Sequence, residues 1–319
     1  MGWHAMKVVV AGATGAIGRP LVAALRQSGH QVYALTRGGR SAELARALGA
    51  TPVLANVLER ESLLRAVAGF SADAVIHELT AYRYSPPTHY RSPGLARTNA
   101  LRTTGSRNLV EFAEKAGATR YLTQSLILGY GIRDHGPEPL TELDPFGRAQ
   151  GDVNDPILSV LYEAEEWAWR ASDIDGIALR YGIFYGPGAS DLYARMLKAR
   201  VFPLPNTGTG HIGFVHIEDA AAATVAALEN GRAGQAYNIV DDESITWDTM
   251  FDATAAAIGA ARPLRVPARV LRLGTPLAAA QMLDMSMRVA NAKARTELGW
   301  KPRYPTYREG LATLAAAPR

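Results

Sequence analysis

Short apolar runs alternate with amphipathic stretches through the first half of the chain. The runs are "KVVVAG" (7–12), "QVYALTR" (31–37), "TPVLANV" (51–57), "DAVIHEL" (73–79) and "RYLTQS" (120–125). Runs that are nearly continuous in apolar residues are typical of parallel strands that helices cover on both faces. A sixth run, "GIALRYGIFYG", follows the amphipathic stretch at 157–171. The pattern therefore predicts an α/β fold with a doubly wound parallel sheet.

Beyond residue 185 the pattern changes to shorter elements joined by Gly- and Pro-rich connections, such as "VFPLPNTGTGHIG". This change predicts two units, residues 1–185 and a smaller C-terminal lobe at 186–319. A segment at about 213–240, which begins "GFVHIEDAAAATVAALE", is expected to return to the first unit.

Composition excludes several classes of function. With 34 Lys and Arg against 30 Asp and Glu, the net charge of +4 is too small and too dispersed to indicate a nucleic-acid surface. The absence of cysteine removes disulfides and thiolate ligands, and it fits a cytoplasmic location. Neither an HExxH pattern nor a run of about 18 apolar residues occurs, so we expect no catalytic metal and no membrane-spanning helix.

Three glycines, Gly12, Gly15 and Gly18, separate the first predicted strand from the first predicted helix in "VVVAGATGAIGRP". At such a place the first glycine permits a tight turn, and the second lets backbone N–H groups approach a pyrophosphate. The third allows helix and strand to pack closely. In this context the motif predicts a dinucleotide-binding domain of Rossmann type.

The end of the second predicted strand indicates which dinucleotide is bound. An acidic residue there would accept a hydrogen bond from a free ribose 2′-hydroxyl, but the chain has "LTRGGR", with Arg37 at that point and Arg40 nearby. A guanidinium instead suits a 2′-phosphate. NADP is therefore favoured over NAD as the cofactor.

Several of these stretches together resemble the extended short-chain dehydrogenase/reductases, the NAD-dependent epimerase/dehydratase-like group. The similar stretches are "GATGAIG", "VIHELTA", "TNALRTTGSRNLVEFAEKAGATRYLTQS", "LRYGIFYGPG", "GFVHIEDAAAATVAALE", "AYNIVDDESITW" and "ANAKARTELGWKPRYPTYREGL". The resemblance covers roughly residues 6–312. It implies an NAD(P)-dependent enzyme with a small-molecule substrate, and a homodimer formed through the helices near 98–117 and 157–171.

The resemblance also implies a cofactor site, position by position. The phosphate loop would comprise Gly12, Thr14, Gly15, Ala16, Ile17 and Gly18. Asn56 and Val57 would border the adenine, and the riboses would pass His77, Leu79 and Thr80. Asn99 matches the helix asparagine of the group, while Tyr181 and Ile183 belong to the segment that lies over the nicotinamide. A structural role is the alternative for His77, because it ends a buried strand.

The group's chemistry needs a serine that orients the substrate oxygen, and a tyrosine and a lysine four residues apart on one helix face. The lysine holds the ribose and lowers the pKa of the phenol. Ser125 occupies the serine position. In "ILSVLYEAEEWAW", however, Tyr162 is followed four residues later by Glu166, and a carboxylate would raise the pKa of a phenol.

A second register of this helix fits the flanking pattern better. Anchored on "AEEWAWRAS", it puts Leu158 at the tyrosine position and Tyr162 at the lysine position. The Tyr-Lys pair is incomplete in either register. Tyr162 is retained as a candidate catalytic residue that faces the cofactor, and the alternative is a half-buried helix aromatic. A proton could also come from another phenol of the pocket or from water.

Other side chains are candidates for contact with the substrate. Tyr82, Tyr84 and Tyr130 follow the fourth and fifth strands, at whose ends ligands of such sheets bind. In the second lobe, His211 is a candidate, whereas His216 is expected to pack with Asp219. Nucleotide-sugar members of the group usually carry an arginine where this chain has Ile212, which cannot neutralise a phosphate. The sequence therefore favours a small, rather apolar substrate.

The sequence is compatible with three functions. The favoured one is an NADP(H)-dependent oxidoreductase that acts on a small, apolar carbonyl or alcohol in specialised metabolism. A cyclase, isomerase, epimerase or dehydratase on the same scaffold would turn over without net change in the nicotinamide. A non-catalytic NADP-binding regulator would bind cofactor and reduce nothing.

Overall fold

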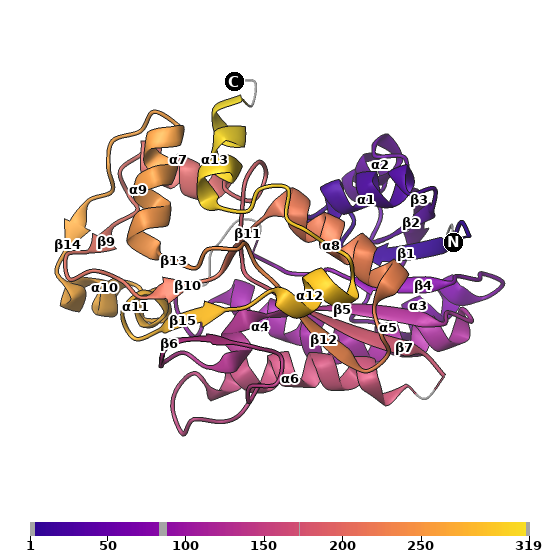
Figure 1. The fold of residues 1–319 in the computed structure, drawn as a ribbon. Coiled ribbons are helices and arrows are strands. Elements are labelled where there is room, and N and C mark those ends of the chain that lie inside the picture. Colours follow the sequence, from indigo (N-terminus) through magenta and orange to yellow (C-terminus); the bar gives the residue numbers. More distant parts are fainter. Residues whose placement is uncertain (1–3, 83–87, 172, 317–319) are drawn as a thin grey trace.

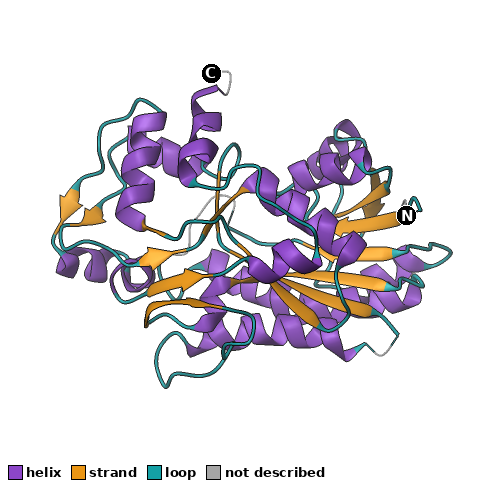
Figure 2. Cartoon of the chain, viewed as in Figure 1, coloured by secondary structure: helices purple, strands orange, loops and turns teal. Residues whose placement is uncertain are grey.

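A computed structural model describes residues 4–82, 88–171 and 173–316 of the chain. Its centre is a seven-stranded sheet in the order β12-β7-β5-β4-β1-β2-β3 (Figures 1 and 2). The strands are β1 (Lys7–Ala11), β2 (Gln31–Thr36), β3 (Thr51–Leu54), β4 (Ala74–His77), β5 (Arg120–Leu126), β7 (Asp175–Tyr181) and β12 (Gln235–Ile239). Every neighbouring pair is parallel. The predicted doubly wound parallel sheet is confirmed.

Helices cover both faces of this sheet, which is why its strands are apolar on both sides. On one face α1 (Gly18–Gln27) packs against α8 (Ile217–Asn230), with α2 (Arg40–Ala47) at the β2–β3 end. On the other face lie α3 (Arg60–Val67), α5 (Ser106–Lys115) and α6 (Asp155–Arg170). Each face thus has its own apolar core, and α8, from the segment at about 213–240, contributes to one of them.

The segment before α5 departs from a regular helix. It runs from α4 (Pro93–Ala100) through a π-helical turn, η1 (Leu101–Gly105), into α5 without interruption. The wider turn of a π-helix carries one extra residue and is frequently found at functional sites. η1 packs against α6, so this irregularity lies beside the helix that carries Tyr162.

The second lobe that the sequence predicts consists of short elements, and its apolar core, which includes Phe214, Trp247 and Leu277, also takes in Ile127 and Leu161 from before residue 185. Its helices α7 (Asp191–Lys198), α9 (Trp247–Ala257), α10 (Ala268–Gly274) and α11 (Pro276–Leu283) gather at one side of Figure 1, and α13 (Tyr307–Ala316) lies beside α9. α12 (Ala292–Glu297) packs on β12.

Four two-stranded pairs complete the fold. They are β8 (Ile183–Tyr185) with β11 (Phe214–His216), β9 (Leu204–Pro205) with β14 (Arg265–Val266), β10 (His211–Ile212) with β13 (Ile245–Thr246), and β6 (Asp134–Leu140) with β15 (Ser286–Val289). β6 follows the short 3-10 helix η2 (Ile127–Tyr130). Strands from before residue 185 therefore pair with strands from after it, as β6 does with β15. The division of the chain into two units at that residue stays a prediction.

The strand order reverses between β1 and β4. Ligands of doubly wound sheets bind at this switch point, outside the carboxyl ends of the strands. The glycine loop follows β1 and residues 78–80 follow β4, so the topology brings both to that place.

Candidate functional site

The loop after β1 is as tight as its glycines suggest. Gly12 has φ +103°, and a Cβ on it would lie 2.6 Å from the Glu78 carbonyl oxygen. The Gly15 N–H donates to the Gly12 carbonyl at 2.8 Å, and a Cβ on Gly18 would collide with that same carbonyl. Helix α1 begins at Gly18, so its first amides lie beside the loop. These residues fit a dinucleotide pyrophosphate, which needs close backbone approach and a helix N-terminus.

The loops after β2 and β3 present polar groups at the same edge of the sheet. Arg37 is exposed directly after β2, and Arg40 opens α2. Asn56 braces its own loop, because its amide nitrogen donates to Glu59 at 2.6 Å and its oxygen accepts from the Leu58 N–H. Val57 is buried, and its carbonyl accepts from Asn108 on α5 at 2.9 Å. These residues lie at the edge where the dinucleotide is expected, and their contact with a cofactor stays a prediction.

His77 ends β4 and is fully buried. Its Nε2 lies 3.0 Å from the Leu101 carbonyl on η1, and its Nδ1 accepts from the Leu79 N–H. Burial lowers the pKa of His77 to about 4, and the nearby Arg102 cation acts in the same direction. Both ring nitrogens are therefore engaged in a neutral imidazole that ties β4 to η1. Leu79 is half-buried and Thr80 is exposed on the loop that follows.

The next residue, Glu78, is a buried acid whose importance the sequence analysis missed. Its Oε1 accepts from the Tyr181 hydroxyl at 2.8 Å, and that hydroxyl lies 2.7 Å from the Thr224 hydroxyl on α8. Its Oε2 is buried and has no hydrogen-bond partner among the described residues. Burial raises the pKa of Glu78 to about 8. An acid at the end of an otherwise apolar strand, in "VIHELTA", was the available signal.

Replacing Glu78 by Gln should flatten the pH dependence of stability. The pKa of Glu78 is raised from 4.5 to about 8, so between those values the folded protein holds a proton that the unfolded chain has released. This contribution to stability is complete below about pH 4.5 and is lost as pH rises towards 8. We expect the Tm of the wild type, measured relative to Glu78→Gln, to fall across this window. Glu61→Gln, at an exposed position, is the control, and a constant difference in Tm would contradict the assignment.

Ser125 and α6 form the candidate catalytic region. Ser125 is fully buried, and its Oγ has no hydrogen-bond partner in the described part of the chain. It lies opposite Arg180 in the register of β5 and β7, on the face of the sheet that α6 covers. The buried face of α6 presents Leu158 and Leu161, whereas Tyr162 is 43% exposed. A hydrogen bond to Glu166 and the charge of that carboxylate raise the pKa of the Tyr162 phenol.

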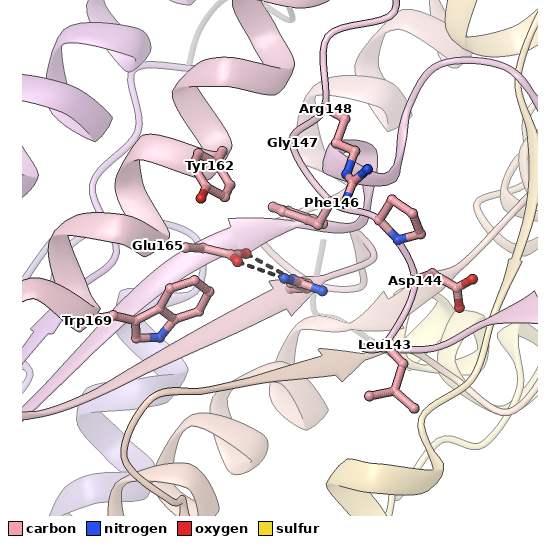
Figure 3. Close-up of a pocket in the computed structure, with 10 residues that line it drawn as sticks. Leu143, Asp144, Phe146, Gly147, Arg148, Tyr162, Glu165 and Trp169 are labelled. Atoms are coloured by element: carbon pink, nitrogen blue, oxygen red, sulfur yellow. Dashed lines mark hydrogen bonds and ion pairs between the residues drawn. The ribbon is translucent and has the colours of Figure 1, made fainter.

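A hollow of about 480 Å³ lies between α6 and the loop at 143–148 (Figure 3). Tyr162 lines it from the helix, and Phe146 and Arg148 line it from the loop. Glu165 and Arg180 form a buried ion pair at its floor, with N–O distances of 3.0 and 2.8 Å. The Phe146 ring centroid lies 3.7 Å from the Arg180 guanidinium carbon. The charges of Glu165 and Arg180 neutralise each other, so this ion pair has a structural role in the hollow.

The predicted substrate residues are distributed over both lobes. The Tyr130 hydroxyl donates to Asn238 at 2.8 Å and accepts from Arg180 at 3.1 Å, and burial raises the pKa of Tyr130 to about 12. Ile212 is fully buried, and His211 is half-buried with the Arg288 guanidinium 3.4 Å away. Tyr82 packs against the apolar core of the second lobe. Tyr84 lies outside the described residues.

His216 and Asp219 make separate contacts near the C-terminus. His216 accepts from the Glu218 N–H and lies 3.1 Å from Thr313, whereas Asp219 accepts from the backbone of Arg303 and Tyr304. Each therefore fastens the C-terminal segment separately.

The described residues contain no group of three or more His, Asp or Glu side chains that could hold a metal ion. Within the same ranges, no helix is both long and apolar enough to span a bilayer.

Comparison with known proteins agrees with this geometry. The NAD dependent epimerase/dehydratase family matches residues 8–240. The chain belongs to this family. Its similar proteins include reductases, epimerases and dehydratases, so the chain is an enzyme of the NAD(P)-dependent oxidoreductase or epimerase/dehydratase type.

Two reductases and a solved epimerase are among the proteins to which this chain is similar. The 3-diazoavenalumate denitrifying reductase of a Streptomyces species is 38% identical over 318 residues, which are 96% of this chain and 99% of that protein. The 2-alkyl-3-oxoalkanoate reductase of Stenotrophomonas maltophilia is 28% identical over 81% of this chain and 77% of its own. Among solved structures, the Thermotoga maritima UDP-glucose 4-epimerase has a TM-score of 0.78 at 21% identity, covering 98% of both chains.

Proposed function

We propose that this protein is an NADP(H)-dependent reductase that removes dinitrogen from an aryl diazonium carboxylate. The observation that carries the proposal is the buried face of α6. Leu158 is fully buried there and Tyr162 is 43% exposed, so the buried face of the helix offers no phenol or lysine to a proton relay. Glu165 is the acid of that face, and Arg180 holds it in an ion pair.

This face of α6 suits a reduction that needs no proton donor. That condition is met when the electron pair displaced by hydride leaves with a neutral molecule. A carbonyl oxygen must take up a proton as it is reduced, and general acid catalysis of that step contributes roughly a factor of 10²–10⁴. When hydride from a bound nicotinamide reaches the carbon of an aryl diazonium, the carbon–nitrogen bond breaks and N₂ departs with its electron pair. One NADPH and one diazonium ion give NADP⁺, the arene and N₂, and no proton is exchanged.

The relative at 38% identity, which is named as a denitrifying reductase of a diazo compound, supports this choice. In the proposed site, the loop Gly12–Gly18 binds the phosphates, Arg37 faces the 2′-phosphate, and the Ser125 hydroxyl orients the polar end of the reacting group. Asn56, Val57, Leu79 and Thr80 line the remainder of the cofactor site. The apolar side chains of the second lobe hold the body of the substrate.

Carbonyl reduction is the second candidate, because one observation favours it. The buried, unpartnered Ser125 Oγ is a hydrogen-bond donor of the kind that a substrate carbonyl accepts from. A relative named as an oxoalkanoate reductase agrees with this reading. The proton would then come from Tyr162, another phenol of the pocket or water.

A substrate panel separates the two candidates. With NADPH and diazotised aminocinnamate we expect nicotinamide oxidation, release of N₂, and cinnamate as product. NADPH that carries deuterium on the transferred position should place it on the ring carbon that lost nitrogen. Tyr162→Phe should keep kcat within about twofold, since no proton relay is needed. Turnover of ketones alone, with a large loss in Tyr162→Phe, would establish the carbonyl reaction instead.

The preference for NADP is tested at Arg37. Loss of a charge-assisted contact to the 2′-phosphate should weaken NADP binding by about tenfold or more in Arg37→Ala, and leave NAD binding unchanged. Arg46→Ala, at an exposed position in the last turn of α2, is the control and should change neither affinity. Titration calorimetry with both dinucleotides gives the two affinities. Equal losses for NADP and NAD would show that Arg37 contacts the adenosine without reading the phosphate.

A further inference from the structure

Arg102 lies on the π-helical turn η1 and is only 2% exposed. Its Nε is buried and has no hydrogen-bond partner within residues 4–82, 88–171 and 173–316. Burial lowers the pKa of the Arg102 guanidinium, and the neighbouring Tyr82 phenol is the group that acts against this shift. No carboxylate of the described chain contributes. By contrast, the other strongly buried arginine of this region, Arg180, is paired with Glu165.

A buried guanidinium without an anion destabilises the fold unless another group or a ligand compensates its charge. Arginine cannot shed its proton in a protein, so burial leaves a full charge to be compensated. Buried polar groups in folded proteins are almost always satisfied, so an exception calls for an explanation such as a functional role or a bound water or ion. The π-helical turn points the same way, because such turns are concentrated at functional sites.

The surroundings of Arg102 place it between the cofactor side and the substrate side. Towards the sheet its neighbour is His77 at the end of β4, whose ring is bound to the carbonyl of Leu101 on the same turn. Its other neighbour is Tyr82, which packs against the apolar core that includes Ile127 and Phe214. Asn99, three residues earlier on the helix, has a buried amide oxygen that lacks a partner in the described ranges. This short stretch of chain therefore carries two unsatisfied polar groups.

We propose that Arg102 binds the carboxylate of the substrate, fixing its apolar body against Tyr82. This assignment rests on the proposed function, and it names the group by which the enzyme would recognise an acidic substrate. The phosphates of a dinucleotide already have the glycine loop and Arg37. One guanidinium beside Tyr82, which packs on an apolar core, is matched by one monoanionic group on an apolar molecule.

The test compares an acid with its neutral ester on the protein saturated with NADP. Cinnamate and methyl cinnamate differ in charge and little in shape. By titration calorimetry we expect the wild type to bind cinnamate about tenfold or more tightly than the ester, as a charge-assisted bidentate contact requires. Arg102→Met should bind both equally, and Arg102→Lys should keep part of the preference. Arg97→Met, at an exposed position of α4, is the control and should keep all of it.

Ligand-free stability separates recognition from a structural role. Arg102→Met removes an uncompensated charge, so its Tm without ligand should equal or exceed that of the wild type, and its NADP affinity should be unchanged. A Tm several degrees lower would make Arg102 structural and overturn the proposal. So would an undiminished preference for cinnamate in Arg102→Met, or no preference in the wild type. A preserved preference without turnover of diazotised aminocinnamate would refute the proposed function alone.

Discussion

Gly12→Ala is expected to remove nearly all dinucleotide binding. Gly12 has φ +103°, which alanine adopts only with strain, and the added Cβ would lie 2.6 Å from the Glu78 carbonyl oxygen. Both obstacles are backbone, so a side-chain rotation cannot relieve them. The loop must move out of the shape that fits a pyrophosphate. Strain of this kind costs about 1–3 kcal/mol, and together with the displaced loop we expect a loss of affinity of roughly 100-fold or more.

Gly29→Ala separates loop geometry from general strain. Gly29 also has positive φ, +86°, but nothing lies within 4 Å of a Cβ built there. The control should therefore lose about 1 kcal/mol of stability and keep its cofactor affinity. Thermal shift with saturating NADP and NAD reports binding without knowledge of the substrate. A normal shift in Gly12→Ala would mean that the loop tolerates the side chain and that the pyrophosphate lies elsewhere.

The sequence predicted the central parallel sheet and the glycine loop because the signals for both are local. Apolar runs without alternation identified the strands of the parallel sheet, and the spacing of Gly12, Gly15 and Gly18 identified the tight loop after the first of them. The resemblance of "VIHELTA" and "LRYGIFYGPG" to one family was confirmed by the match over residues 8–240. These features follow from backbone geometry and from which face of an element is buried, and both leave a short-range pattern.

The polar groups of the interior could not be predicted in the same way. Glu78 meets Tyr181 across 103 residues, and His77 meets the carbonyl of Leu101, which lies on the π-helical turn η1. Arg102 stands in a segment that reads as one amphipathic helix, in which nothing local shows that its side chain is buried. Such pairs depend on how distant elements come together. Whether Ser125 and Tyr162 take part in catalysis stays a prediction for the same reason.

Arg180→Met is expected to destabilise the protein strongly. The Arg180 guanidinium binds both oxygens of Glu165 at 3.0 and 2.8 Å, and Glu165 is fully buried. Methionine fills much of the same space, so the main loss is electrostatic: the Glu165 carboxylate would stay buried without a partner. Breaking a buried ion pair from one side costs about 3–5 kcal/mol, which corresponds to a fall in Tm of about 10 °C for a chain of this size.

Two controls show whether charge is the cause. In Arg180→Met with Glu165→Leu both charges are gone, and an apolar pair of similar volume can be as stable as the ion pair it replaces. The double variant should therefore regain most of the lost Tm. Arg170→Ala removes the surface pair with Glu166 on the same helix, where the side chains are 57% and 30% exposed, and should cost no more than about 1 kcal/mol. If the double variant were as unstable as Arg180→Met, the contacts of Arg180 with Phe146 and Tyr130 would carry the stability instead, because both variants lose them equally.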